Sequence, residues 1–284
     1  MRPSRGQTVI WWRVQRRPWQ PEAVLSDKEI GAFLADGYVA LRGAVPAPVI
    51  AACQDMIWAE LGRQGVRRDD PATWTAPVVR INCPEGGPFA AAGTTPVLQE
   101  ACDQLIGPGR WWRREGVGGT IPVRFPSEDD PGDAGWHIES SFEVGGEPRV
   151  SAGSRDRGLL ALYLLTDVEP AGAPTRLRPG SHRDVPPILA PAGEEGMAWL
   201  PAAQQAARAS AHRRTALATG RAGDLFLCHP FLVHAASWPH RGRFPRIIAQ
   251  PGVALYGQYA LRAGPGETPP PVQRAILGSL PAAS

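Results

Sequence analysis

The sequence of 284 residues is poor in lysine and cysteine and contains no long hydrophobic run. Lys28 is its only lysine, so arginine carries nearly all of the positive charge. The formal net charge of +3 is small and no basic stripe forms, which argues against a nucleic-acid partner. The four cysteines are widely spaced and include no C-x-x-C pair, so we expect the reduced, partly buried thiols of a cytosolic protein.

The chain also lacks any segment that approaches the roughly 18 consecutive apolar residues of a membrane span. Its arginine-containing start has a short apolar patch, but neither a continuous apolar core nor a small-residue cleavage site, so we do not expect a signal peptide. We expect a cytoplasmic protein without a membrane partner, whose residues 1–21 form a loose extension. Nothing in the sequence predicts the oligomeric state.

The sequence predicts a mainly helical part over residues 22 to about 110. Ser26 and Glu29 form a capping box that opens a first helix, and a strand is expected over 38–41. Periodic apolar residues predict further helices over about 46–62 and 96–105. The segment 63–95 between them is rich in proline and glycine and has no clear assignment.

Beyond Trp111 the pattern changes to short apolar runs bounded by glycine, proline and aspartate, which is typical of strands. The expected strands are 120–125, 136–142, 158–168, 175–178, 224–235 and 246–255, with one helix over about 201–218. We therefore predict a mainly β fold with flanking helices, whose core over about 111–260 is a double-stranded β-helix, or jelly roll. Residues 22–284 are expected to form a single domain.

The segment Gly135-Trp-His-Ile-Glu139 carries the first candidate metal ligands. On a strand, His137 and Glu139 point to the same face because they are two positions apart. An imidazole and a carboxylate on one face are two of the three protein ligands in the facial triad that holds Fe(II). Alone, the H-x-E tripeptide is a weak signal because it often arises by chance.

A third ligand must come from elsewhere, and His229 and His234 are the candidates. They are an odd number of positions apart, so only one of them points inward on a regular strand. We favour His234, because the small residues that follow it leave room for a cosubstrate. His229 is then a structural histidine, although Pro230 could introduce a bulge and weaken this parity argument.

Three arginines follow within a dozen residues, and one of them can hold a carboxylate with its planar fork. We favour Arg246 because it opens an apolar strand, whereas Arg241 and Arg243 are interpreted as loop charges. Arg124 alternates with apolar neighbours, and a buried arginine needs an anionic partner, so it is a candidate contact for substrate or cosubstrate.

Other residues have weaker interpretations. Trp111 and Trp112 are candidate substrate contacts, although adjacent tryptophans are more often core residues. His182 is expected in a turn, His212 on a helix surface and His240 in an exposed loop.

The order of H-x-E, a long insertion, His234, and Arg246 about a dozen residues later resembles the phytanoyl-CoA dioxygenase family of Fe(II)/2-oxoglutarate oxygenases. The segment 172–182, which ends in P-G-S-H, and the opening helix and strand over 25–39 are similar to segments of that family. The resemblance covers roughly residues 24–255.

The resemblance implies that His137, Glu139 and His234 bind the iron. It also implies that Arg246 pairs with the distal carboxylate of 2-oxoglutarate and that the hydroxyl of Thr175 contributes to the same site. Glu139 departs from the family pattern, in which Asp is more usual, and it adds one methylene to the ligand.

On this resemblance we expect an enzyme that uses Fe(II), 2-oxoglutarate and O₂ to hydroxylate, desaturate or cyclise a small molecule, with release of succinate and CO₂. Two alternatives stay open: a cupin-like isomerase or dioxygenase that does not use 2-oxoglutarate, and a non-catalytic jelly-roll binding protein. The substrate is not predicted. We expect its pocket to be walled by 63–95, by Trp111 and Trp112, and by a lid loop over 143–157.

Overall fold

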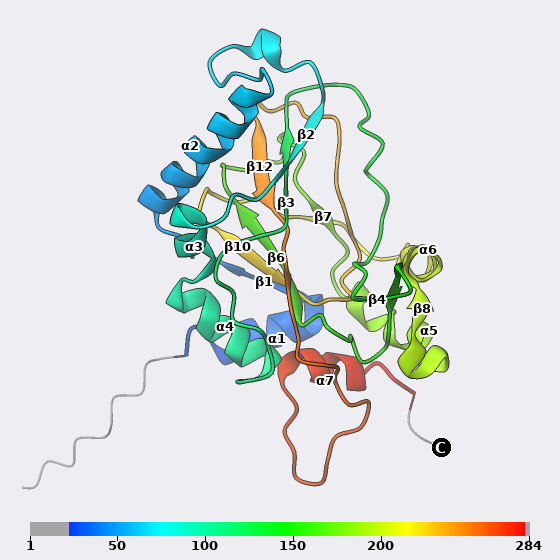
Figure 1. Ribbon diagram of the computed structural model, residues 1–284. Coiled ribbons are helices and arrows are strands. Elements are labelled where there is room, and N and C mark those ends of the chain that lie inside the picture. The colour runs from blue at the N-terminus through cyan, green and yellow to red at the C-terminus, as the bar shows by residue number, and fades with distance from the viewer. Residues whose placement is uncertain (1–22, 282–284) are drawn as a thin grey trace, which may run out of the picture.

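The computed structural model describes residues 23–281, so the loose extension predicted for 1–21 lies outside the described residues. A seven-stranded antiparallel sheet runs in the order β1-β10-β6-β12-β3-β2, and β13 also pairs with β6 (Figure 1). Its strands are β1 (Tyr38–Leu41), β2 (Val78–Asn82), β3 (Thr120–Arg124), β6 (Leu159–Leu164), β10 (Leu225–Cys228), β12 (Arg246–Ala249) and β13 (Gly252–Val253).

Two three-stranded sheets, ordered β11-β7-β9 and β4-β5-β8, accompany the large sheet. Their strands are β4 (Phe142–Val144), β5 (Glu147–Val150), β7 (Arg176–Leu177), β8 (Met197–Ala198), β9 (Ala216–Leu217) and β11 (His234–Ala235). Strand β6 is buried on both faces, because Leu160, Leu162 and Leu164 pack with Leu177 of β7 in one core and the alternate residues face a second core. This packing of sheet against sheet confirms the predicted mainly β fold with a jelly-roll core.

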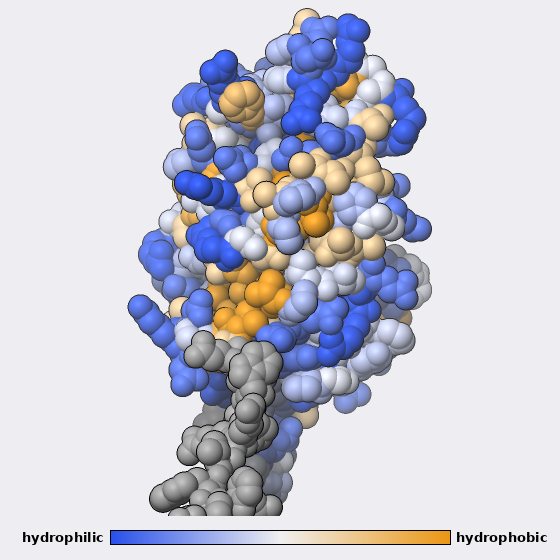
Figure 2. All heavy atoms as spheres, turned by 90° about the vertical axis from the view of Figure 1, so that its left-hand side faces the viewer, coloured by the Kyte–Doolittle hydropathy of each residue, from blue (hydrophilic) through white to orange (hydrophobic). Residues whose placement is uncertain are grey.

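Helices cover the other face of the large sheet. In Figure 1, α2, α3 and α4 lie on the left, α1 and α7 at the lower end, and α5 and α6 on the right. The helices are α1 (Asp27–Asp36), α2 (Ala47–Arg63), α3 (Gly87–Gly93), α4 (Pro96–Ile106), α5 (Pro186–Leu189), α6 (Trp199–Ala209) and α7 (Pro271–Leu277), with 3₁₀ turns η1 (Pro71–Thr73), η2 (Ser181–Arg183) and η3 (Ala190–Glu195). The helix-covered face is largely hydrophilic outside, with hydrophobic residues gathered beside the start of the described chain (Figure 2).

The capping box predicted at the start of α1 is present. The backbone N–H of Ser26 donates to the Glu29 carboxylate at 2.8 Å, and the Glu29 N–H donates back to the Ser26 hydroxyl at 3.4 Å. The helix ends at Gly37, whose φ of 83° is left-handed. A Cβ at Gly37 would overlap the ring of His182, so this position requires glycine for two independent reasons.

The prediction of a strand over 136–142 is wrong. Only His137 pairs there, through an isolated bridge, and regular pairing begins at Phe142. The helix predicted over 201–218 is too long, since α6 ends at Ala209. Arg178, which directly follows β7, donates to Ala207 O and to the Ser210 hydroxyl and so binds the end of that helix.

The segment 143–157, predicted as a lid loop, contains a β-hairpin. Strands β4 and β5 pair across Gly145 and Gly146, which both have positive φ, and β5 pairs onward with β8. Two glycines between short strands are a hairpin signal, and it was available in the sequence. Residues 63–95, which had no assignment, contain η1, β2 and α3, and α7 was not foreseen.

All four cysteines are buried and free, which agrees with the expectation of thiols. Burial raises the pKa of each of them, to about 12 for Cys53. Among residues 23–281, no helix is long and apolar enough to cross a membrane.

Two buried histidines connect the strands to the helices at one end. The ring centroids of His182 and His229 are 4.9 Å apart, and their Nε2 atoms lie 3.2 Å and 3.3 Å from the carbonyl oxygens of Leu34 in α1 and Val272 in α7. Burial lowers the pKa of His182 to about 4 and the pKa of His229 well below its ordinary value. Both side chains are therefore neutral in the folded protein at neutral pH.

This pair predicts acid sensitivity. Between pH 6.5 and about 4, the unfolded chain binds protons that buried His182 does not, so the free energy of unfolding should fall by up to about 3 kcal/mol from this residue. Urea unfolding measured from pH 4 to 7 tests the expectation. His182→Gln should flatten the slope, and His212→Gln, at an exposed turn after α6, should not. Equal slopes for the two variants would contradict the prediction.

Candidate metal centre

Three side chains from two distant segments of the chain meet at one point at β11. His137 and His234 face each other across an isolated antiparallel bridge, each donating its backbone N–H to the other's carbonyl at 2.9 Å. Glu139 lies two residues further on, and its Oε1 is 3.2 Å from His234 Nε2 and 3.9 Å from His137 Nε2. One ligand atom from each residue lies within 4.8 Å of the others. Adjacent donors around an octahedral metal are about 3 Å apart, so this spacing fits a metal ion.

The hydrogen bonds of the two imidazoles fix which nitrogen is free. His137 Nδ1 lies 2.8 Å from Gly135 O and His234 Nδ1 lies 3.0 Å from Leu232 O. A carbonyl only accepts, so Nδ1 carries the proton in both rings and each Nε2 presents a lone pair. Nε2 of His234 and the carboxylate oxygen of Glu139 are then both electron-pair donors. Their approach to 3.2 Å is explained by a cation shared between them, either a proton, as in a hydrogen bond from His234, or a metal ion.

The charge states also suit a metal. Burial, followed by the neighbouring His234, lowers the pKa of His137. Burial alone would raise the pKa of Glu139, but the hydrogen bond and the charge of His234 outweigh it and lower this pKa to about 2. At neutral pH the cluster therefore offers a neutral imidazole and an ionised carboxylate, the forms that bind metals.

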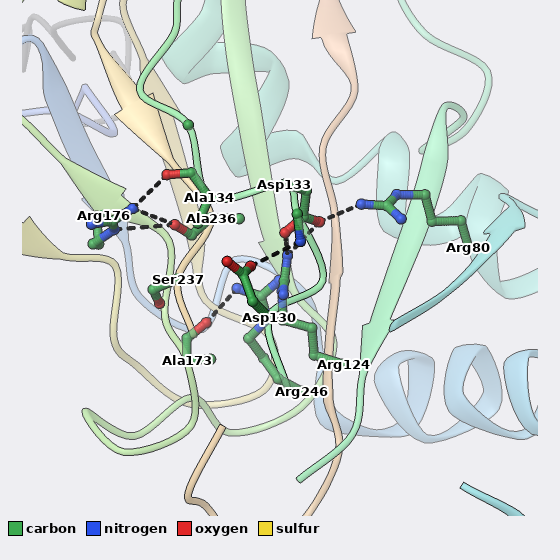
Figure 3. Close-up of polar contacts among 12 residues, drawn as sticks. Arg80, Arg124, Asp130, Asp133, Ala134, Ala173, Arg176, Ala236, Ser237 and Arg246 are labelled. Atoms are coloured by element: carbon green, nitrogen blue, oxygen red, sulfur yellow. Dashed lines mark hydrogen bonds and ion pairs between the residues drawn. The ribbon is translucent and has the colours of Figure 1, made fainter. Parts of the chain in front are cut away.

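The backbone around the ligands is held by side chains that sequence reasoning missed. Arg176 donates to the carbonyls of Ala134 at 2.7 Å and Ala236 at 2.9 Å and so joins the two ligand segments (Figure 3). The guanidinium groups of Arg176 and Arg178 lie 4.7 Å and 4.1 Å from the ring centroid of Trp136. These contacts restrict the segment that carries His137.

A cluster of buried arginines lies where β12 pairs with β3. Arg246 of β12 and Arg124 of β3 are direct cross-strand neighbours, 2% and 3% exposed. Arg124 donates to both carboxylate oxygens of Asp133 at 2.6 Å, and Arg80 also pairs with Asp133 (Figure 3). Arg246 donates to Ala173 O at 2.6 Å. Arg124 and Arg80 thus share one carboxylate while Arg246 bonds a neutral carbonyl, so the cluster has an excess of positive charge.

Within residues 23–281, three N–H donors of this cluster have no acceptor. The Nε atoms of Arg246 and Arg124 and the Nε2 of His240 are all buried without a hydrogen-bond partner. His240 Nδ1 accepts from the N–H of Gly242 at 3.1 Å, so its proton is on Nε2. Burial, with the charges of Arg246 and Arg124, lowers the pKa of His240 to about 4, so the ring is a neutral donor. Buried donors are rarely left unpaired, and this set fits an anionic ligand.

The sequence model of the family "Phytanoyl-CoA dioxygenase (PhyH)" matches residues 33–248. The chain belongs to this family. The assignment confirms the resemblance seen in the sequence and the class expected from it, an Fe(II)/2-oxoglutarate-dependent dioxygenase with iron, 2-oxoglutarate and O₂ as cofactor and cosubstrates.

Solved structures show the same fold. They include SnoK, a non-heme alpha-ketoglutarate-dependent carbocyclase from nogalamycin biosynthesis (TM-score 0.54, 17% identity, 84% of this chain and 87% of the other). EctD from S. alaskensis with 2-oxoglutarate and 5-hydroxyectoine has a TM-score of 0.54 at 21% identity, covering 84% and 78%. HygX from Streptomyces hygroscopicus with nickel, 2-oxoglutarate and hygromycin B has a TM-score of 0.51 at 16% identity, covering 81% and 88%. No functionally curated protein matches the sequence.

The remaining candidate residues of this PhyH-family chain lie in different surroundings, some buried and some exposed. Thr175 is buried directly before β7, the strand that pairs with β11 and its metal ligand. Arg241 is exposed and pairs with Glu128, and Arg243 lies over the exposed ring of Phe244. Of the three arginines that follow His234 in this dioxygenase, Arg246 alone belongs to the buried cluster.

The two tryptophans are not brought to the metal ligands. Trp111 is buried on the helix side of the sheet, where its indole N–H donates to Asp103 at 2.8 Å. Trp112 is 58% exposed and packs on Tyr256 with ring centroids 4.5 Å apart.

His240, expected in an exposed loop, is 5% exposed, so that expectation is wrong. A bridge between Ser127 and His240 buries it.

Proposed function

We propose that His137, Glu139 and His234 bind the iron of this dioxygenase and that it oxidises a C–H bond of a small molecule. The observation that supports this most directly is the convergence of two Nε2 atoms and one ionised carboxylate within 4.8 Å. The extra methylene of Glu139 is accommodated, because its carboxylate lies in contact with His234.

We further propose that the distal carboxylate of 2-oxoglutarate binds the arginine cluster. Arg246 would supply the main charge–charge contact, and Arg124 and His240 would supply additional N–H donors. Thr175, buried directly before β7, would donate its hydroxyl. This assignment gives an acceptor to three buried donors that otherwise have none, which supports it against a metalloenzyme that does not use 2-oxoglutarate.

Bound iron would supply the activation of O₂ coupled to the conversion of 2-oxoglutarate to succinate and CO₂. The chain itself would orient the reactants and limit the access of competing water to a partly buried site. Because Glu139 provides the third ligand, no protein ligand position is open to a halide. We therefore propose hydroxylation, desaturation or cyclisation. Relatives with this fold have different substrates and reactions, so the fold does not select among them.

The direct test is loading and turnover of the purified protein. We expect one Fe(II) per chain and slow formation of succinate from 2-oxoglutarate in air, lost when the iron is chelated. Iron binding without consumption of 2-oxoglutarate would favour the cupin-like alternative, and no iron binding would favour a binding protein. The cytoplasmic location stays a prediction.

A further inference from the structure

The peptide group between Ile138 and Glu139 lies outside the strand pairing of the segment that carries these candidate ligands. The bridge at His137 is isolated, and regular pairing begins again only at Phe142. Ile138 is fully buried, so its carbonyl needs a hydrogen-bond donor other than a neighbouring strand. The indole N–H of Trp199 is that donor, since its Nε1 lies 2.6 Å from Ile138 O.

The ring of Trp199 also packs against His137. The two ring centroids are 6.5 Å apart and the ring planes meet at 81°, an edge-on arrangement in which aromatic rings attract each other. Trp199 therefore has two contacts with the ligand segment, a hydrogen bond to its backbone and a packing contact with its imidazole.

A small sheet holds Trp199 in this place. Trp199 is the first residue of α6 and directly follows β8, a strand that pairs with β5. Arg149 of β5 also donates to the carbonyls of Glu195 and Gly196 at 2.8 Å, just before β8. Strand β5 pairs in turn with β4, which begins three residues after Glu139, and β4, β8 and α6 lie together on the right of Figure 1. The chain thus leaves Glu139 through paired strands and returns at Trp199 to the carbonyl that precedes Glu139.

The hydrogen bond acts on Glu139 through the plane of one peptide. A peptide group is planar, so a fixed Ile138 O also fixes the direction of the N–Cα bond of Glu139. The glutamate side chain then has one more rotatable bond than aspartate, and ordering it on a metal costs more conformational entropy. The metal affinity of a glutamate ligand therefore depends more strongly on a backbone that is already in place.

We propose that Trp199 is a positioning residue of this dioxygenase, whose indole N–H holds the backbone of Glu139 in the orientation that binds Fe(II). Trp199 acts through this ligand and not on the reacting atoms. The inference rests on the proposed function, since it takes Glu139 as an iron ligand.

The test begins with Trp199→Phe, which removes the donor to Ile138 O and keeps an aromatic ring against His137. Anaerobic titration with Fe(II) should show binding about 10- to 100-fold weaker than in the wild type, the loss typical of removing a group that orients a metal ligand. If melting temperatures show that Trp199→Phe is unfolded, Trp199→Met takes its place, because it also lacks the N–H and fills the space flexibly.

Trp74→Phe is the matched control, because it also removes one indole N–H from a backbone carbonyl. The Trp74 indole donates to Arg67 O at 2.8 Å and packs against Trp58 of α2. Trp74→Phe should therefore bind Fe(II) as the wild type does.

Co(II) gives a readout that a loss of stability alone does not move, because its visible absorption depends on the number and geometry of its ligands. At saturating Co(II), the spectrum of Trp199→Phe should differ from that of the wild type in the same direction as the spectrum of Glu139→Ala. In a Glu139→Ala background, Trp199→Phe should lower Co(II) affinity by less than it does alone, because it acts through a ligand that is already missing.

The proposal is overturned if Trp199→Phe binds Fe(II) as tightly as the wild type or leaves the Co(II) spectrum unchanged. It is also overturned if Trp74→Phe loses as much affinity, or if Trp199→Phe lowers Co(II) affinity by the same factor with and without Glu139. A wild type that binds neither metal, or a Glu139→Ala variant that binds both as the wild type does, would count against the proposed function. Normal binding by the wild type and weak binding by Glu139→Ala, with Trp199→Phe unaffected, would count against this inference alone.

Discussion

Replacing His234 by alanine should remove iron binding and lower succinate formation by more than about 100-fold. Altering a residue that only supports a metal ligand already costs about 10- to 100-fold in affinity or activity, so loss of a ligand should cost more. Two remaining ligands cannot hold facial geometry. The measurements are iron content after anaerobic loading and succinate formed per chain.

His212→Ala is the matched control, since it removes an exposed imidazole and should change neither quantity. Glu139→Asp keeps the charge but shortens the ligand, and it should retain part of the iron affinity. His229 accepts from the N–H of Phe231 and approaches Val272 O, so both of its nitrogens are already engaged. If His229→Ala lost iron while His234→Ala kept it, the assignment of the third ligand would be wrong.

Those features of the fold that depend on neighbouring residues were predictable from the sequence. The capping box of Ser26 and Glu29 and the periodic apolar face of α2 act within one or two turns, and both helices were predicted close to their observed bounds. The H-x-E spacing of His137 and Glu139 is also local, and it identified two of the three side chains that converge.

What could not be predicted depends on partners distant in sequence. The run from Trp136 to Phe142 alternates like a strand, but its neighbour β11 is only two residues long, so pairing is limited to His137. Likewise, the prolines and arginines around His240 suggest an exposed loop, whereas its bridge to Ser127 buries it. The end of α6 is set by Arg178, which no local signal reveals.

Replacing Arg246 by alanine should raise the 2-oxoglutarate requirement by about 100-fold or more while iron content stays near normal. Losing one partner of a buried, hydrogen-bonded charge pair typically costs 2–5 kcal/mol. The remaining cluster would hold Arg124 and Arg80 against Asp133, with less excess positive charge for a carboxylate. The measurements are the KM for 2-oxoglutarate in succinate formation and the iron content of the same samples.

The variants of Arg246 separate charge from geometry. Arg246→Lys keeps the charge but loses the planar fork, so its KM should lie between those of the wild type and Arg246→Ala. Arg241→Ala and Arg243→Ala remove loop charges outside the buried cluster and should leave KM unchanged. His240→Phe should have a smaller effect than Arg246→Ala, since it removes one neutral donor. Melting temperatures of all variants identify any that are destabilised by the change in a buried side chain. A KM for Arg246→Ala equal to that of the wild type, or a larger rise for Arg241→Ala or Arg243→Ala, would show that the distal carboxylate binds elsewhere.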